Sequence, residues 1–345
     1  MENQTKVLVT GAGGFIGHHL VTFLKNKGYW VRGVDIKMPE YSEPDADEFE
    51  LLDLRFWENC LKATEGVTEV YALAADMGGM GYISNHHAEI LYNNALINFH
   101  TLEAARQNSV KRYLYTSSAC IYPEYLQEDA QVVPLKESDA YPAQPQDAYG
   151  WEKLITEILC GHYSKDYGIE TRTVRFHNIF GELGTWDGGR EKAPAAMCRK
   201  IALAKMTDKP EIEIWGDGEQ TRSFCYIDDC VEGIYRLMRS DFREPLNLGQ
   251  DRMISINELV EMVSTVADYP IEKKHIDGPQ GVRGRNSDND LLRKVLGWEP
   301  QISLEEGLAR TYKWIEAQTR ETYQPEKSKT NDAAFAANQT ATAAV

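Results

Sequence analysis

The amino-acid sequence predicts an α/β fold in which a doubly wound parallel sheet carries a smaller, interleaved α+β lobe. Two observations predict it. Short apolar runs alternate with amphipathic helical patterns over residues 1–176, an order that favours parallel strands joined by helical crossovers. After residue 177 the alternation becomes less regular, which indicates a second unit inserted between the last elements of the sheet.

The first part of the chain supplies most of the sheet. Apolar runs of about four to eight residues indicate buried strands, and longer runs with one apolar face indicate helices. The expected strands cover 7–10, 31–34, 67–74, 112–117 and 171–176, and the expected helices cover 18–27, 88–107 and about 146–166. These elements define a first domain over residues 1–176.

The second part mixes further helices with short strands. Helices are expected at 194–205, within 226–239, and at 256–267, 288–296 and 304–318, with strands at 211–215 and near 246–249. We expect residues 223–249 to return to the sheet, and residues 177–222 and 250–320 to form a substrate-binding lobe. The segment 325–345 is rich in Ala, Thr and Asn with few apolar anchors, so we expect it to be disordered.

Composition excludes several classes of protein. The 345 residues include 37 basic and 53 acidic ones, a formal charge of −16, and such a surface repels nucleic-acid backbones. The six cysteines lack metal-type pairs, which favours reduced thiols, and the paired histidines at 18–19 and 86–87 lack ligand spacing. No apolar run approaches the roughly 20 residues that cross a bilayer, and no signal peptide is recognisable. We therefore expect a cytoplasmic protein with no metal, no nucleic acid and no membrane partner.

Three glycines mark the first strand-to-helix turn, at Gly11, Gly14 and Gly17. Glycines there let the pyrophosphate of a dinucleotide approach the helix N-terminus, whose free N–H groups attract an anion. Phe15 and Ile16 lie inside this turn. A glycine-rich turn without a ligand is the alternative, but the position between strand and helix favours a Rossmann-type dinucleotide site.

Two acidic residues bear on the identity of the cofactor. Asp35 ends the second expected strand, where a carboxylate accepts hydrogen bonds from the adenosine ribose and repels a 2′-phosphate. The expected cofactor is therefore NAD rather than NADP. Asp53 either contacts the adenine edge or caps the helix that begins near Arg55.

Tyr149 and Lys153 stand four residues apart on an expected helix, so they share one face. A lysine there can bind a nicotinamide ribose and lower the pKa of the phenol, which lets the tyrosine take a proton from a sugar hydroxyl. Ser118, at the carboxyl end of a central strand, is the expected hydroxyl partner of Tyr149. The alternatives are a core tyrosine and a serine that satisfies backbone groups at the strand end.

Cys120 and Lys192 are candidates for a second proton transfer. Cys120 lies two residues after Ser118, and a thiol can act as a base when its pKa falls, which simple alcohol oxidation does not require. Lys192 follows a glycine pair and precedes Pro194, so a loop can bring it over a pocket before a helix begins. The alternatives are a buried apolar cysteine and a solvated surface lysine.

Three arginines suit a nucleotide diphosphate, because guanidinium binds phosphate in a bidentate manner. They are Arg222, Arg283 and Arg285, and structural salt bridges are their alternative role. The glycine-rich segment 77–81 follows an expected strand and could line a sugar pocket without side-chain bulk, or form a flexible turn.

These residues resemble the extended short-chain dehydrogenase/reductase superfamily, from the first strand to about Trp314. The glycine turn, Asp35, Ser118, Tyr149 and Lys153 carry that likeness. Five further segments, in the same order, resemble the GDP-hexose epimerases of that superfamily. They are residues 74–81, 117–124, 175–178, 188–195 and 281–288.

The resemblance implies an enzyme that uses NAD and acts on GDP-mannose or a related GDP-hexose. It implies transient oxidation at C4, inversion at C5 and C3 by Cys120 and Lys192 on opposite faces of the sugar, and reduction to GDP-L-galactose, or GDP-L-gulose where only C5 inverts. The implied substrate contacts are Gly78, Ser118, Cys120, Asn178, Glu191, Lys192, Ala193, Lys200, Gln220, Arg222 and Arg285. The resemblance also implies a homodimer built through a helix pair.

Two other functions compete with this one. A sugar-nucleotide 4-epimerase of the same fold needs no thiol base, and the related dehydratases usually carry an Asp-Glu pair where Ala119 and Cys120 stand. A non-catalytic NAD-sensing scaffold would not need Ser118, Tyr149 and Lys153 intact. The tail after residue 318 lies outside the resemblance.

Overall fold

The computed structural model describes residues 4–78, 80–83, 85–278 and 281–323. Its main sheet has seven parallel strands in the order β11-β6-β5-β4-β1-β2-β3, which confirms the predicted doubly wound sheet. The strands are β1 (Lys6–Thr10), β2 (Trp30–Asp35), β3 (Glu48–Leu51), β4 (Glu69–Ala72), β5 (Arg112–Ser118), β6 (Glu170–Phe176) and β11 (Pro245–Leu248). The segment 325–345, for which disorder is expected, lies outside the described residues, as does Gly79 of the glycine-rich segment.

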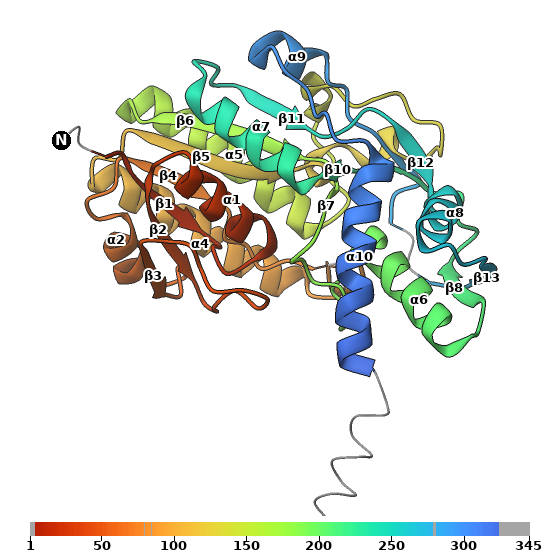
Figure 1. Cartoon of the computed structure of the whole chain (residues 1–345). Helices are drawn as coiled ribbons and strands as arrows, with labels where there is room; N and C mark the ends of the chain where they lie inside the picture. The colour runs from red at the N-terminus through yellow and green to blue at the C-terminus, as the bar shows by residue number, and fades with distance from the viewer. Residues whose placement is uncertain (1–3, 79, 84, 279–280, 324–345) are drawn as a thin grey trace, which may run out of the picture.

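Helices cover both faces of this sheet (Figure 1). One face carries α1 (Phe15–Asn26) and α7 (Ile227–Arg239), and the other carries α2 (Trp57–Thr64), α4 (His87–Gln107) and α5 (Ala148–Tyr167). Strands buried on both faces are expected to be almost wholly apolar. The central strand β1 shows this, with a fully buried run from Val7 to Val9.

The edge strand β3 lies outside the sequence prediction. Its residues alternate Glu48-Phe49-Glu50-Leu51, and none of them is fully buried. An edge strand has one solvated side, so the continuous apolar run that marks the inner strands is missing here. The pairing of β3 with β2 is nevertheless parallel and in register from Arg32 to Asp35.

A second lobe packs beside the carboxyl edge of the sheet (Figure 1). Its main helices are α6 (Ala193–Thr207), α8 (Ile256–Ala267) and α10 (Leu304–Tyr323). Its shorter elements are α9 (Asp290–Leu296), β7 (Ile179–Phe180), β8 (Glu211–Trp215), β9 (Thr221–Ser223), β10 (Cys225–Tyr226), β12 (Met253–Ser255), β13 (Glu272–Ile276) and β14 (Gly284–Arg285). One apolar core runs without interruption from α1 and α7 into these three helices, so the lobe is anchored on one face of the sheet.

Capping residues at the two ends of α5 fix where the helix begins and ends, and so fix the positions of the predicted tyrosine–lysine pair. Asp147 caps the helix, and its side chain accepts a hydrogen bond of 2.8 Å from the amide of Gly150, as expected of an N-cap aspartate. The helix ends at Gly168, whose φ of 74° is left-handed, a conformation that glycine adopts without strain. Tyr149 and Lys153 therefore occupy the first two turns, beside the end of β5.

Among the described residues, no helix combines the length and apolar character needed to cross a membrane. In the same part of the chain, no group of three or more His, Cys, Asp or Glu side chains is arranged to hold a metal ion.

Candidate active site

The glycine turn after β1 is built for close backbone packing. Gly11 has φ +71°, and a Cβ on Gly17 would lie 2.0 Å from the carbonyl oxygen of Gly11, so a larger residue cannot replace Gly17 without moving the backbone. Gly14 is the N-cap of α1, and within the described residues no side chain caps this end and no acidic residue lies in its first turn. The first-turn positions are Phe15, Ile16 and Gly17. This N-terminus suits the pyrophosphate of NAD, because helix N-terminal N–H groups bind anions.

Asp35 lies at the end of β2, next to the same turn. Its carboxylate accepts hydrogen bonds from the amides of Gly13 (2.9 Å), Ile36 (2.7 Å) and Lys37 (3.2 Å). Burial raises the pKa of Asp35, and these three amide donors oppose the rise. The carboxylate is thus held in place beside the turn, where the ribose of a dinucleotide is expected.

Asp53 takes part in a local ion pair. Both of its oxygens face the Arg55 guanidinium, with a shortest distance of 2.6 Å, and Oδ1 also accepts from the Arg55 amide at 3.0 Å. The N-cap of α2 is Phe56, so Asp53 does not cap this helix as one interpretation expected. It forms a turn just before the helix.

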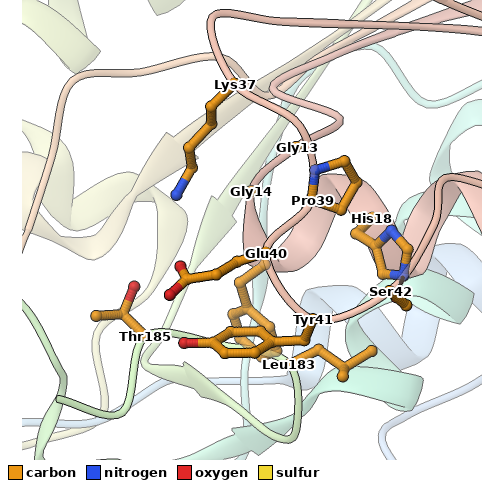
Figure 2. A pocket seen from close by; sticks show the side chains of 11 residues that line it. Gly13, Gly14, His18, Lys37, Pro39, Glu40, Tyr41, Ser42, Leu183 and Thr185 are labelled. Carbon is orange, nitrogen blue, oxygen red and sulfur yellow. Dashed lines mark hydrogen bonds between the residues drawn. The ribbon is translucent and has the colours of Figure 1, made fainter. Parts of the chain in front are cut away.

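A cavity of about 60 Å³ opens beside the glycine turn. Gly13 and Gly14 form one wall, and the segment from Lys37 to Ser42 forms another. Figure 2 shows that the side chains of Lys37, Glu40 and Thr185 point into the same space. Cys120 and Tyr149 are not among the residues that line this cavity.

The tyrosine of the predicted pair is almost fully buried at the end of β5. Burial raises the pKa of Tyr149 well above its ordinary value, the neighbouring Cys120 and Glu152 raise it further, and a hydrogen bond with Ser118 lowers it. The Ser118 hydroxyl therefore lies beside the Tyr149 phenol, and its role as the hydroxyl partner stays a prediction. Its Oγ also accepts from the amide of Cys120 at 3.2 Å.

The ammonium of Lys153 is bound by backbone and carboxylate oxygens of the protein. The Lys153 ammonium donates to the carbonyl oxygen of Thr116 at 3.1 Å and lies 3.7 Å from Oε1 of Glu152. Its Nζ is 5.4 Å from the centre of the Tyr149 ring. Burial is the largest cause of the raised pKa of Tyr149, followed by the charges of Cys120 and Glu152, so a lowering of this pKa by Lys153 stays a prediction.

Cys120 lies in a short 3₁₀ turn, Ala119–Ile121, that packs directly on α5. A Cβ on Gly150 would lie 2.2 Å from the carbonyl oxygen of Cys120, so only glycine allows this contact. The Sγ of Cys120 accepts a hydrogen bond of 3.2 Å from Nη1 of Arg285. Arg285 is itself fixed, because its Nε donates to Oε1 of the buried Gln127 at 2.5 Å.

Lys192 is the N-cap of α6. Its surface is reached by solvent, yet protein surrounds the ammonium closely enough for burial to lower its pKa. The two facts agree if the residue lines an opening between the lobe and the sheet. Cys120 and Arg285 are among the groups whose charges act on Lys192, so the two predicted acid/base residues lie within electrostatic reach of each other.

Arg222 and Arg285 form a pair of cations across the β9–β14 ladder. They are direct partners in its register. Burial, and then the charge of Arg285, lower the pKa of Arg222, but a guanidinium remains charged at neutral pH. Arg283 lies apart, in a bidentate surface pair with Asp217 at 2.8 Å. For Arg283 the structural salt bridge is therefore the role that the structure shows.

The other predicted substrate contacts are held by nearby protein groups. Asn178 has φ 45° and donates to the carbonyl of Ser223 at 2.9 Å. Glu191 pairs with Arg199 at 2.7 Å. The remaining placements are Lys200 bonded to the carbonyl of Glu213 (2.5 Å), Gln220 bonded to the carbonyl of Trp215 (3.2 Å), Ala193 at the first position of α6, and Gly78 against Tyr82. No contact described for Glu191 or Lys200 joins it to the group around Cys120.

Three residues near the site were not predicted from the sequence. Glu152 lies next to Lys153, Asn94 donates a hydrogen bond to Glu152, and Gln127 accepts one from Arg285. Glu152 is inside the motif around Tyr149, and its burial could have been inferred from its place on the inner face of a covered helix. Gln127 lies in an irregular loop, where no periodicity marks a residue as buried.

Comparison with known proteins agrees with this geometry. Residues 7–249 match the model of the NAD dependent epimerase/dehydratase family, which confirms NAD as the expected cofactor. The chain is 56% identical to GDP-mannose 3,5-epimerase of Arabidopsis thaliana, over 96% of this chain and 86% of that protein, and 56% identical to GDP-mannose 3,5-epimerase 1 of Oryza sativa subsp. japonica, over 92% and 83%.

Solved structures of sugar-nucleotide epimerases share the fold. UDP-glucose 4-epimerase of Thermotoga maritima superposes with a TM-score of 0.82 at 26% identity, covering 91% of this chain and 99% of that one. UDP-glucuronic acid 4-epimerase of Bacillus cereus, solved with UDP-glucuronic acid and NAD, superposes with a TM-score of 0.76 at 26% identity, covering 91% and 100%. The chain therefore belongs to the NAD-dependent epimerase/dehydratase family.

Proposed function

We propose that this protein is an NAD-dependent GDP-mannose 3,5-epimerase. It converts GDP-D-mannose into GDP-L-galactose, and into GDP-L-gulose where only C5 is inverted. The observation that carries the proposal is the position of Cys120, which lies beside the Ser118–Tyr149 hydrogen bond and is held there by Arg285. A 4-epimerase has no use for a thiol at this point, whereas inversion at C5 and C3 requires proton-transfer groups.

The NAD site is formed by the glycine turn and Asp35, and NAD, when bound, supplies reversible two-electron oxidation at C4 of the sugar. Tyr149 takes the proton from the C4 hydroxyl and later returns it, with Ser118 as its hydroxyl partner. A ketone at C4 acidifies the C–H bonds at C3 and C5. Cys120 and Lys192 then remove and deliver protons at these carbons on opposite faces of the ring, so each inversion breaks one C–H bond and forms another.

Charge in the lobe suits the nucleotide half of this substrate. Arg222 and Arg285 are neighbours in the β9–β14 ladder, and burial already disfavours the charge of Arg222. A diphosphate between them would relieve this repulsion, because guanidinium groups bind phosphate oxygens in pairs. Arg285, which donates a hydrogen bond to Cys120, would then also contact the diphosphate of the bound nucleotide.

Deuterium exchange tests this reaction directly. The protein is incubated with GDP-mannose and NAD in deuterated water, and the sugar nucleotides are analysed by NMR and mass spectrometry. We expect deuterium at C5 and C3 of the products and none at C4. Cys120→Ala and Lys192→Ala should each abolish the exchange while NAD still binds. Inversion at C4 alone, without deuterium at C5, would instead identify a 4-epimerase.

We also propose a homodimer formed through α4 and α5, which pack side by side (Figure 1). Both helices expose large apolar side chains, a feature that marks interaction surfaces. They are Leu91, Tyr92 and Phe99 on α4, and Trp151, Ile155 and Ile158 on α5. Ile155→Glu should convert the dimer into a monomer in sedimentation experiments, whereas a wild-type protein that sediments as a monomer would contradict the proposal.

A further inference from the structure

A buried carboxylate lies directly beside the lysine of the active site. The side chain of Glu152 is 1% exposed, and its Oε1 lies 3.7 Å from Nζ of Lys153, which is itself 3% exposed. Neither the proposed chemistry nor the sequence patterns assign a role to Glu152. A carboxylate buried this deeply is costly to the fold unless it is paired and hydrogen-bonded.

Two amides from α4 hold this carboxylate. Asn94 donates to Oε1 of Glu152 at 2.9 Å, and Asn98 donates to Oε2 at 3.0 Å. Asn94 is fixed in turn, because its Oδ1 accepts from the amide of Asp76 at 2.6 Å and its Nδ2 donates to the Asp76 carbonyl at 3.0 Å. Burial raises the pKa of Glu152, and Lys153 and the two amides oppose that rise. Donors on both oxygens and a nearby ammonium favour an ionised Glu152.

An ionised Glu152 places a negative charge 3.7 Å from the Lys153 ammonium. The ammonium attracts negative charge on the phenol, and the carboxylate opposes it. Burial is the largest cause of the raised pKa of Tyr149, and the charges of Cys120 and Glu152 add to the rise. The ionisable groups that face this cluster are Tyr115 from β5, Cys120 from the 3₁₀ turn, Asp147 at the start of α5 and Asp76 after β4, while α4 contributes only neutral amides. Lys153 is therefore the cation nearest to the carboxylate among the described contacts.

We propose that Glu152 is a positioning residue that fixes the Lys153 ammonium and sets the pH range in which Tyr149 exchanges its proton with the sugar. The role rests on the proposed function, since it concerns the oxidation and reduction steps at C4. It follows that Tyr149 is kept protonated to a higher pH than lysine alone would allow. Protonated Tyr149 is the form needed to return the proton at the end of each cycle.

Glu152→Gln removes the charge and keeps the size and the acceptor oxygen. The charge of Lys153 then acts on Tyr149 without opposition, so the limb of the pH profile that reports Tyr149, measured as turnover with GDP-mannose, should move to lower pH by about one unit. Asn98→Ala removes one donor from Glu152 and should move the profile in the same direction by less. If Glu152→Gln does not fold, Asn98→Ala tests the same proposal.

Glu157→Gln is the matched control. Glu157 is also a buried glutamate of α5, but it pairs with Arg175 at 2.8 Å, not with Lys153. Its replacement should lower the melting temperature and leave the pH profile in place. A folded, active Glu152→Gln protein with the wild-type profile would overturn the proposal.

A titration without substrate separates this proposal from the proposed function. Tyrosinate absorbance of the NAD-loaded protein is followed against pH, and the signal of Tyr149 is obtained as the difference from Tyr149→Phe. The pH at the midpoint of the Tyr149 titration should fall when Glu152→Gln is introduced into both the wild type and Tyr149→Phe. Lack of GDP-mannose turnover in the wild type would contradict the proposed function alone, whereas equal midpoints would contradict the role of Glu152.

Discussion

The guanidinium of Arg285 donates to the sulfur of Cys120 at 3.2 Å, although 165 positions separate the two residues in the chain. Cys120 follows a strand of the main sheet, whereas Arg285 belongs to the small sheet of the second lobe. The contact therefore joins the two parts of the molecule at the point where the proposed proton transfers occur. Gln127 stabilises this contact, because its side-chain oxygen accepts a hydrogen bond from the Nε of Arg285.

Removing Arg285 should impair catalysis rather than folding. In Arg285→Met the thiol loses its charged donor and the nucleotide loses one cation, so we expect kcat/KM for GDP-mannose to fall by about 100-fold. Arg283→Met is the matched control, because Arg283 pairs with Asp217 at the surface, and exposed pairs contribute little. A similar loss in both variants would show that charge near this strand, and not the contact with Cys120, matters.

Lys192 should be the most reactive lysine of the protein at neutral pH. Burial lowers the pKa of its ammonium, so a larger fraction is the free amine than for an ordinary lysine, while its surface remains open to solvent. Limited acylation at neutral pH, followed by peptide mass mapping, should therefore label Lys192 first, and GDP-mannose should protect it. Uniform labelling of all surface lysines would contradict this.

The sheet and much of the catalytic group follow from local patterns. Buried parallel strands carry apolar runs, so β1 and β5 are recognisable in the sequence, and helical spacing places Tyr149 and Lys153 on one face. The glycine turn is recognisable because its backbone must approach both a helix and an anion. Each of these features depends on residues close together in the chain, so a single segment of sequence is enough to predict it.

The parts that the sequence did not predict depend on contacts between distant segments. Whether an arginine binds an anion or an acidic side chain is decided by its neighbours in space, and this separates Arg283 from Arg285. The pKa of Tyr149 depends first on its burial and then on the charges of Cys120 and Glu152, and hydrogen bonds from α4 hold the Glu152 carboxylate in place. The spacing of residues along the chain predicts neither the partners of these arginines nor the pKa of Tyr149.

Gly150 should be essential because it lets Cys120 pack against α5. In Gly150→Ala the new Cβ would meet the carbonyl oxygen of Cys120 at 2.2 Å, so the 3₁₀ turn must move away from Tyr149. We expect turnover to fall by about 100-fold, measured as kcat with GDP-mannose, with NAD affinity retained.

A second glycine of the same helix provides the control for this change. A Cβ on Gly161 would meet no atom within 4 Å, and alanine is the better helix former by about 1 kcal/mol. Gly161→Ala should therefore keep full activity and raise the melting temperature. If Gly150→Ala also kept full activity, the close contact between α5 and Cys120 would not be required for catalysis.

His177 should make the stability of the protein depend on pH below neutrality. The side chain is fully buried, and burial lowers its pKa to about 3, although Asn247 hydrogen-bonds the ring at 3.1 Å. The unfolded chain binds a proton at His177 near pH 6.5, whereas the folded chain does not. The stability that neutral His177 contributes is therefore present above pH 6.5 and is lost as the pH falls from there toward 3.

The size of this effect follows from the linkage relation. Between pH 7 and pH 5 the His177 contribution to the free energy of unfolding should fall by about 2 kcal/mol, and His177→Gln should remove that part of the pH dependence because glutamine does not titrate. Urea unfolding of both proteins at the two pH values measures the difference. His275→Gln is the control, since His275 is exposed and should leave the pH dependence as it is. Parallel losses in the wild type and in His177→Gln would mean that carboxylates, and not this histidine, set the acid sensitivity, because a carboxylate that stays ionised in the fold also binds a proton on unfolding.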